Sequence, residues 1–226
     1  MPAPRRGTLV RVSEADFINS GGEVTGPGSA AGGAGGGGTF SQQFNHNPVS
    51  ARVPERLARG ALGTGVIVLT GPNEFILDFV QVLARPPQVV ARVVMPPAVA
   101  SSFAGALRDN LEKYTQSFGP PPALPRPPQR RPTIQEIYDN LKIPEELLSG
   151  AYANAAIVGH SPAEFFFDFI TGFYPTAAVS ARVFVAAAQA PRVLEAVAGA
   201  VKQFEERARG AGGEPPPPPP DAQPHG

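Results

Sequence analysis

The chain of 226 residues contains no cysteine, and its charges cancel. The absence of cysteine excludes disulfide bonds and thiolate chemistry. The 19 basic residues balance the 19 acidic residues. The sequence therefore gives no electrostatic basis for non-specific binding to nucleic acid or to anionic membranes.

Long apolar runs are also missing. No stretch approaches the roughly 20 apolar residues of a membrane-spanning helix. Arg5 and Arg6 are not followed by the apolar core of a secretory signal. We therefore expect a cytoplasmic protein without a membrane partner.

Glycine and proline, in contrast, are concentrated in three segments that have few apolar side chains. Such segments cannot offset the entropy lost on ordering. We predict a mostly disordered Gly-rich segment at 1–43, a Pro-rich linker at 119–142 and a disordered Pro-rich tail at 210–226. Within the first of these, the sequence leaves open whether residues 8–18 form an ordered element. Roughly 130–150 residues remain, which is enough for one compact core.

The remaining residues contain an internal repeat. Residues 53–118 and 143–208 align without a gap at an offset of 90, with 19 identities in 66 positions. Glu74-Phe-Ile-Leu-Asp78-Phe matches Glu164-Phe-Phe-Phe-Asp168-Phe, and Ala91-Arg-Val matches Ala181-Arg-Val. The matched residues include Glu, Asp, Arg and Phe, so alanine content does not explain them. The chain is therefore a tandem duplication, with repeat one at 44–118 and repeat two at 143–209.

Each copy predicts the same elements. A Pro-Glu-x-x-Leu segment is typical of one helical turn, and Gly-Pro or Ser-Pro marks the first turn between strands. We expect strands at 61–70, 74–83 and 88–95 with a helix at 98–118, and strands at 151–160, 164–173 and 178–186 with a helix at 189–209.

Period-two alternation divides each predicted strand into two faces. A hairpin register with Phe79 opposite Ala91 brings Phe75, Leu77 and Phe79 to a face that the helix would cover. The other face is unusually apolar for a surface exposed to water. Its apolar members are the candidate contact face, namely Ile76, Val90, Val94, Phe166, Ile170 and Phe184.

A three-stranded sheet with one helix is marginally stable alone. We therefore predict an α+β fold in which two β-β-β-α repeats pack as a pseudo-two-fold intramolecular dimer with antiparallel sheets. In this scheme the second apolar faces of the two sheets bury each other.

Copy two carries the residues of a family resemblance. In order it reads Ile143-Pro-Glu-Glu-Leu, Tyr152-Ala-Asn154, His160-Ser-Pro-Ala-Glu164-Phe and Asp168-Phe. In these residues it resembles a prokaryotic domain-of-unknown-function family, numbered 3467, whose members look like short single-unit proteins. Copy one departs from the pattern, with Leu62 and Thr64 in place of Tyr152 and Asn154. The resemblance covers both repeats; it supports the fold and implies no activity or site residue.

The strand face that holds the apolar residues also carries candidate polar groups. They are Glu74, Asp78 and Arg92 in copy one and Glu164, Asp168 and Arg182 in copy two. Paired carboxylates can perform acid/base work or bind a hard cation. Because an arginine should lie across from each aspartate, the favoured interpretation is a structural ion pair that fixes the strand register. We predict no catalytic residue, metal or cofactor.

These observations favour a non-enzymatic protein-interaction or assembly module whose partner is another protein or a second copy. The alternative is binding of single-stranded nucleic acid by stacking on the outer aromatic residues Phe166 and Phe184, which the neutral charge disfavours. A hydrolase or metal enzyme built on the carboxylates is the least favoured hypothesis.

Overall fold

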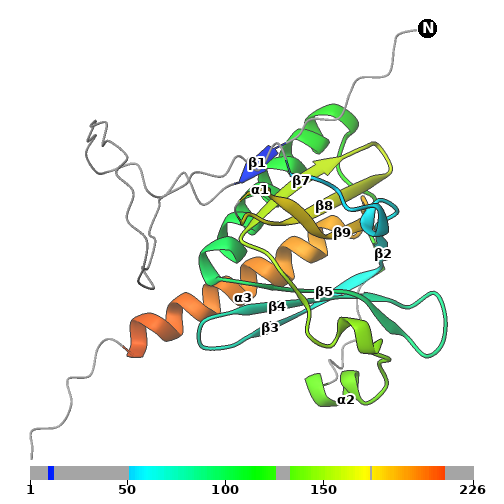
Figure 1. The fold of residues 1–226 in the computed structure, drawn as a ribbon. Helices are drawn as coiled ribbons and strands as arrows, with labels where there is room; N and C mark the ends of the chain where they lie inside the picture. The colour runs from blue at the N-terminus through cyan, green and yellow to red at the C-terminus, as the bar shows by residue number, and fades with distance from the viewer. Residues whose placement is uncertain (1–9, 13–50, 126–132, 174, 212–226) are drawn as a thin grey trace, which may run out of the picture.

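The computed structural model describes residues 10–12, 51–125, 133–173 and 175–211 (Figure 1). The predicted Gly-rich segment, apart from residues 10–12, lies outside these ranges, as do residues 44–50 of repeat one, residues 126–132 of the linker and nearly all of the tail. Within the segment 8–18, Val10–Val12 form strand β1.

Copy one folds as a 3-10 turn, four strand segments and a helix. These are η3 (Glu55–Leu57), β2 (Ala61–Gly63), β3 (Gly65–Thr70), β4 (Phe75–Gln81), β5 (Gln88–Met95) and α1 (Pro97–Phe118). Pro97 occupies the first turn of α1, where a backbone N–H would have no partner within the helix.

Copy two repeats this order. Its elements are η4 (Glu145–Leu147), β6 (Ala151–Tyr152), β7 (Ala155–His160), β8 (Glu164–Thr171), β9 (Ala178–Ala186) and α3 (Ala190–Ala211). The helical turns after Pro54 and Pro144 are confirmed as 3-10 turns.

The first predicted strand of each copy is broken in two, which the periodicity did not predict. In copy one the break is at Thr64, whose backbone N–H and hydroxyl donate to the carbonyl of Val80 at 2.8 and 3.2 Å. In copy two the Asn154 side chain accepts from the N–H of Gly172 at 2.7 Å and donates to its carbonyl at 3.2 Å. Polar side chains that bond nearby backbone compete with the sheet ladder, so the strand changes direction at these residues.

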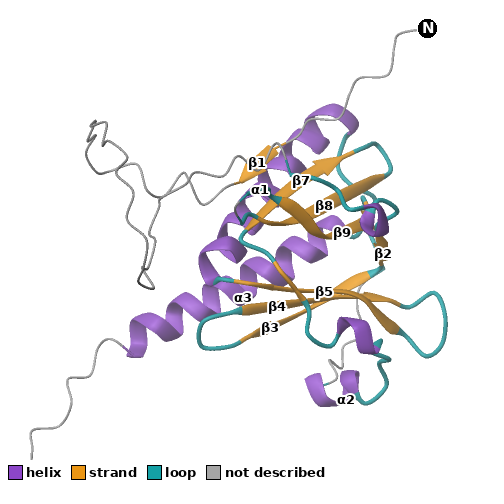
Figure 2. Cartoon of the chain, viewed as in Figure 1, coloured by secondary structure: helices purple, strands orange, loops and turns teal. Residues whose placement is uncertain are grey.

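The broken strands allow the two copies to exchange their first strand segments. One sheet has the order β1-β7-β8-β9-β2, and the other has the order β3-β4-β5-β6. The strands of both sheets are orange in Figure 2. β2 of copy one pairs in parallel with β9 of copy two, and β6 of copy two pairs in parallel with β5 of copy one. The predicted α+β pseudo-dimer is confirmed, and its sheets are antiparallel except at these two exchanged pairs.

The hairpin register follows the prediction. Phe79 lies opposite Ala91 and Asp78 lies opposite Arg92, and copy two repeats this pairing at positions 90 residues later. In both copies the register then shifts by one residue, so that Val90 and Ser180 form β-bulges.

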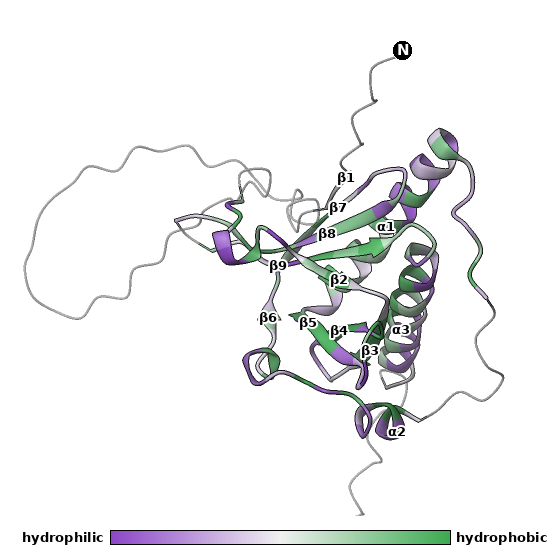
Figure 3. Cartoon of the chain, turned by 90° about the vertical axis from the view of Figure 1, so that its right-hand side faces the viewer, coloured by the Kyte–Doolittle hydropathy of each residue, from purple (hydrophilic) through white to green (hydrophobic). Residues whose placement is uncertain are grey.

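Each helix packs on the strands of the other copy, and the prediction that each helix covers its own strands is therefore wrong. α1 lies along β7, and α3 lies along β3. The rings of Tyr114 in α1 and Phe165 are 5.3 Å apart, and those of Phe204 in α3 and Phe75 are 5.4 Å apart. α3 turns its hydrophobic face toward the strands and its hydrophilic face outward (Figure 3).

One core joins the inner faces of both sheets. The ring of Phe79 lies 6.0 Å from Phe167 and 5.7 Å from Phe169, and Phe103 of α1 lies 5.2 Å from each of the latter two. All four rings are fully buried. The inner faces thus meet each other, and the prediction that the second faces do so is wrong. The inner faces carry the fully buried phenylalanines of the strands, whose burial gains much free energy, namely Phe75, Phe79, Phe165, Phe167 and Phe169.

The predicted linker contains a short helix. Thr133 and Glu136 form a capping box at the start of α2 (Ile134–Tyr138), in which each side chain accepts from the other residue's backbone N–H. The backbone N–H of Lys142 donates to the carbonyl of Pro87 at 2.9 Å, and the carbonyl of Lys142 accepts from the N–H of Val89 in β5 at 2.9 Å. The end of the linker is therefore attached to β5. None of the described helices is long and apolar enough to cross a membrane.

Candidate functional site

The outer face of the β3-β4-β5-β6 sheet is built around a buried ion pair. Arg92 donates through Nε and Nη2 to the two carboxylate oxygens of Asp78, both at 2.7 Å, and Asp78 is fully buried. The hydroxyl of Tyr138 in α2 also donates to this carboxylate. Burial and the bond to Asp78 raise the pKa of Tyr138, so the tyrosine keeps its proton. The Asp78 carboxylate is thus occupied by three donors.

Copy two has the equivalent pair. Arg182 donates to both oxygens of Asp168 at 2.6 Å, and the hydrogen bond raises the pKa of Arg182. Position 48, which corresponds to Tyr138, is a proline and lies outside the described residues. Bidentate Arg–carboxylate bonds are strong and directional, which fits their place across neighbouring strands.

The two glutamates of the predicted polar set lie away from the aspartates. The carboxylate of Glu74 accepts from the N–H of Asn73 at 3.2 Å in the β3–β4 turn. Glu164 is exposed at the start of β8. The carboxylate of each aspartate is therefore paired with an arginine and not with the glutamate of its own strand. Within the described ranges no group of three or more His, Asp or Glu residues could hold a metal ion.

The predicted apolar contact face is only partly covered. Ile170 is fully buried, and packs in a small cluster with Leu57 of η3 and Val179. The other five residues, Ile76, Val90, Val94, Phe166 and Phe184, are partly exposed. The rings of Phe166 and Phe184 lie 6.4 Å apart, and each sits over a glycine backbone, Gly159 and Gly60 respectively.

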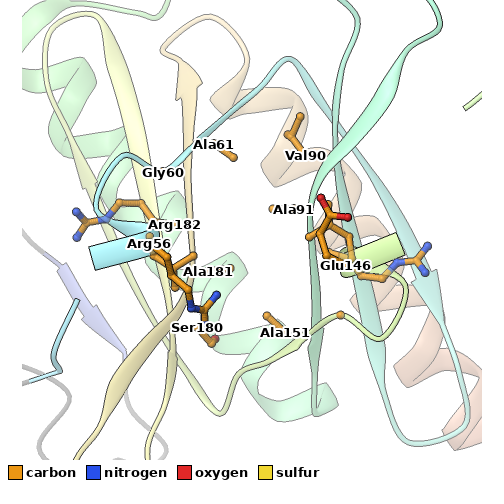
Figure 4. Close-up of a pocket in the computed structure, with 14 residues that line it drawn as sticks. Arg56, Gly60, Ala61, Val90, Ala91, Glu146, Ala151, Ser180, Ala181 and Arg182 are labelled. Carbon is orange, nitrogen blue, oxygen red and sulfur yellow. The ribbon is translucent and has the colours of Figure 1, made fainter. Parts of the chain in front are cut away.

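A groove of about 430 Å³ lies on the pseudo-two-fold axis, where β5 and β9 pass each other (Figure 4). Its lining consists of residues related by the offset of 90, such as Gly60 with Gly150 and Ala91 with Ala181. The equivalent positions Arg56 and Glu146 break the symmetry, because they place opposite charges on opposite walls.

The free edge of β3 is the other distinctive surface. β3 ends its sheet, and no strand in the described part of the chain pairs with its outer side. The equivalent strand, β7, pairs on that side with β1 in antiparallel register. All six residues of β3 are partly exposed, whereas Ile157 alone of the six residues of β7 is not buried.

The sequence predicted the strand but not its position at the edge. Residues 65–70 lie within the predicted strand 61–70, yet strand order depends on partners distant in the sequence. One available signal was the segment 8–18, which offers a single extra strand for two equivalent edges. The pseudo-two-fold symmetry then implies that this segment can complete only one of the two edges.

Comparisons with known proteins agree with the repeat. A family model described as Protein of unknown function (DUF3467) matches the chain twice, at residues 29–122 and 125–209. The predicted resemblance and the tandem arrangement are confirmed. Neither the comparison with curated proteins nor that with solved structures found a match.

Proposed function

Because the chain belongs to the DUF3467 family and carries two copies of its domain, we propose that it is a protein-interaction and assembly module whose partner adds a β-strand to the free edge of β3. The observation that carries this proposal is the difference between two equivalent strands. β7 is completed by β1, and β3 has no such partner among the described residues.

The backbone of β3 is arranged to accept a strand. At the end of the β3–β4 hairpin, Gly71 donates its N–H to the carbonyl of Glu74 at 2.9 Å. Residues of an antiparallel ladder bond to alternate sides, so the N–H and C=O groups of Val66 and Val68 point to the free edge. Their equivalents on β7, Ala156 and Val158, pair with β1.

The side chains of β3 do not protect this edge. Natural edge strands are commonly shielded by charged residues, prolines or bulges. β3 reads Gly-Val-Ile-Val-Leu-Thr and has none of these. Strand addition uses backbone hydrogen bonds for affinity and side-chain contacts for specificity, and this edge offers both.

The geometry supports this function better than the alternatives. The carboxylates of Asp78 and Asp168 are each held by a bidentate arginine, which opposes an acid/base role. Phe166 and Phe184 each pack against a glycine and are only partly exposed, and Arg182 is bonded to Asp168. These contacts leave little of the predicted stacking surface for a nucleic-acid base.

Amide hydrogen exchange tests the proposal with a peptide of residues 8–13, Thr-Leu-Val-Arg-Val-Ser. This peptide contains the β1 sequence, which already fits the equivalent edge. We expect the amides of Val66 and Val68 to exchange more slowly when the peptide is present. The amides of Ile67 and Leu69 should not change, because alternation directs them to β4.

The matched control is Val68→Pro. Proline lacks the backbone N–H that points to the free edge at this position, and the change removes no hydrogen bond to β4. The variant should keep its circular dichroism spectrum and lose the peptide effect. If a saturating peptide leaves Val66 and Val68 unprotected in the wild type, strand addition at β3 is not the function of this edge.

A further inference from the structure

Building on the proposed function, we infer that the strand received by β3 is β3 of a second copy of this chain. The two strands run antiparallel, with a two-fold axis at Ile67. The dimer joins two four-stranded sheets into one continuous sheet of eight strands.

The backbone pattern and the pairing of β7 with β1 together place the axis. The edge groups belong to Val66, Val68 and, at the end of the strand, Thr70. On β7, strand β1 pairs only with Ala156, Ile157 and Val158, the equivalents of residues 66–68. The same use of β3 gives two hydrogen-bonded pairs when Val66 of each copy lies opposite Val68 of the other. Ile67 then faces its own equivalent as a non-hydrogen-bonded pair between them. In such a pair the Cα atoms are about 4.5 Å apart. This register is centred on Ile67, as the pairing of β1 with β7 is centred on Ile157.

The side chains also suit self-pairing. An antiparallel strand that pairs with itself brings like residues together, which is unfavourable for charged residues. β3 has no charged residue, and its centre is Val-Ile-Val. β-branched residues are favoured in strands because they pack well against cross-strand neighbours.

The surface beside the edge is apolar and locally neutral. Ile67 lies beside Asp78 on β4, and Asp78 is neutralised by Arg92 on the next strand. Leu69 lies beside Ile76, and both are partly exposed. On this outer face two copies can therefore approach without repulsion between unpaired charges, and they partly cover Ile67 and Leu69. On the inner face, Arg207 of α3 donates to the hydroxyl of Thr70 at 2.8 Å, which places its charge at the end of the edge and away from the axis at Ile67.

A two-fold contact uses both β3 edges and leaves neither open. The contact argued above is one pair of six-residue strands, whereas stable interfaces usually bury at least about 1,000 Å². We therefore expect a reversible dimer that dissociates on dilution.

Cysteine cross-linking tests the register, because the natural chain has no cysteine. Ile67→Cys should form an intermolecular disulfide under mild oxidation, since the Cα separation of such a pair fits disulfide geometry. The matched control is Ile157→Cys, the equivalent position on β7, whose edge is occupied by β1. The control should stay reduced at the same protein concentration.

Analytical ultracentrifugation of the full chain tests the association itself. The wild type should shift from monomer to dimer as concentration rises. Ile67→Lys should raise the concentration at the midpoint at least tenfold, because it opposes two like charges at the axis. Ile67 is partly exposed, so this variant keeps the fold.

Three outcomes overturn the inference. In the first, the wild type is monomeric at all concentrations and Ile67→Cys forms no cross-link, which shows that no second copy binds there. In that case, protection of Val66 and Val68 by the peptide would show that strand addition stands and that the partner is another protein.

In the second outcome, both amides are protected in the monomer without peptide, which shows that a segment of the same chain occupies the edge. In the third, a dimer forms but is unaffected by Ile67→Lys, which places the contact elsewhere on the surface.

Discussion

At the scale of single residues, His160 shows how the duplication diverged. It lies at the end of β7, is 5% exposed, and its Nδ1 lies 2.9 Å from Oδ1 of Asn110 in α1. Its ring packs against Tyr114 and Phe165. The equivalent residue in copy one is Thr70, which accepts a hydrogen bond from Arg207 in α3 at 2.8 Å. The strand end of each copy is therefore bonded to the helix of the other copy, but through different side chains in the two copies.

This histidine predicts a pH dependence of stability. Burial, together with the charge of Lys113, lowers the pKa of His160 in the folded protein. The unfolded chain, with a histidine pKa of about 6.5, takes up the proton first. The free energy of unfolding should therefore fall as the pH drops through and below about 6.5.

Thermal unfolding at pH 7.5 and pH 5 measures this effect. The Tm of the wild type should fall more between the two values than that of His160→Thr, which carries the residue of copy one. Equal losses of Tm in the two proteins would show that His160 is protonated as easily in the folded state as in the unfolded chain.

At the scale of secondary structure, two glycines control the exchanged strands. Gly60 precedes β2 and Gly150 precedes β6, with φ of 64° and 69°. A Cβ at Gly150 would lie 2.8 Å from Cγ2 of Val94, and one at Gly60 would lie even closer to the ring of Phe184. Both glycines thus combine left-handed backbone with close packing against the strand on which the exchanged segment pairs.

Replacing these glycines should be costly. Gly150→Ala should lower the free energy of unfolding by about 1–3 kcal/mol, the cost of holding a non-glycine residue in strained backbone. Gly60→Ala should cost at least as much, because its closer contact is with a ring whose backbone is fixed in β9. Urea denaturation followed by circular dichroism provides the measurement.

Gly199 in α3 supplies the control for both substitutions. A Cβ there would meet nothing within 4 Å, so Gly199→Ala should stabilise the protein by about 0.5–1 kcal/mol. If Gly150→Ala proved as stable as the wild type, β6 would not depend on the turn that this glycine forms.

At the scale of the whole molecule, the two copies depend on each other. β2, β6 and both helices pack on the opposite copy. A single copy alone would expose Phe167 and Phe169, which are fully buried against Phe79 and Phe103. Neither copy therefore has a complete core of its own.

This dependence predicts the behaviour of separated copies. Residues 51–125 and 133–211, expressed together as two chains, should co-purify as a 1:1 complex. Each fragment expressed alone should be unfolded or form a homodimer, since only another copy can supply the exchanged strand and helix. Light scattering and circular dichroism distinguish these states. A stable, folded monomer of either fragment would contradict the exchange.

Local sequence determined much of this protein. The offset of 90 identified the two copies, and period-two alternation predicted the register that places Asp78 opposite Arg92. The register follows from residues close in sequence, because hairpin pairing is set by the turn and by the alternation of side chains. The same alternation predicted the buried inner phenylalanines. The two long helices could be predicted from apolar residues at helical spacing.

Tertiary structure alone decided which copy each element joins. Thr64 and Asn154 redirect the first strand into the other sheet, and α1 and α3 cross to cover the other hairpin. These choices depend on contacts between residues far apart in the chain, so no local pattern encodes them. The open edge of β3 has the same origin: its six residues make a strand in any arrangement, but only the order of the strands leaves that edge without a neighbour among the described residues.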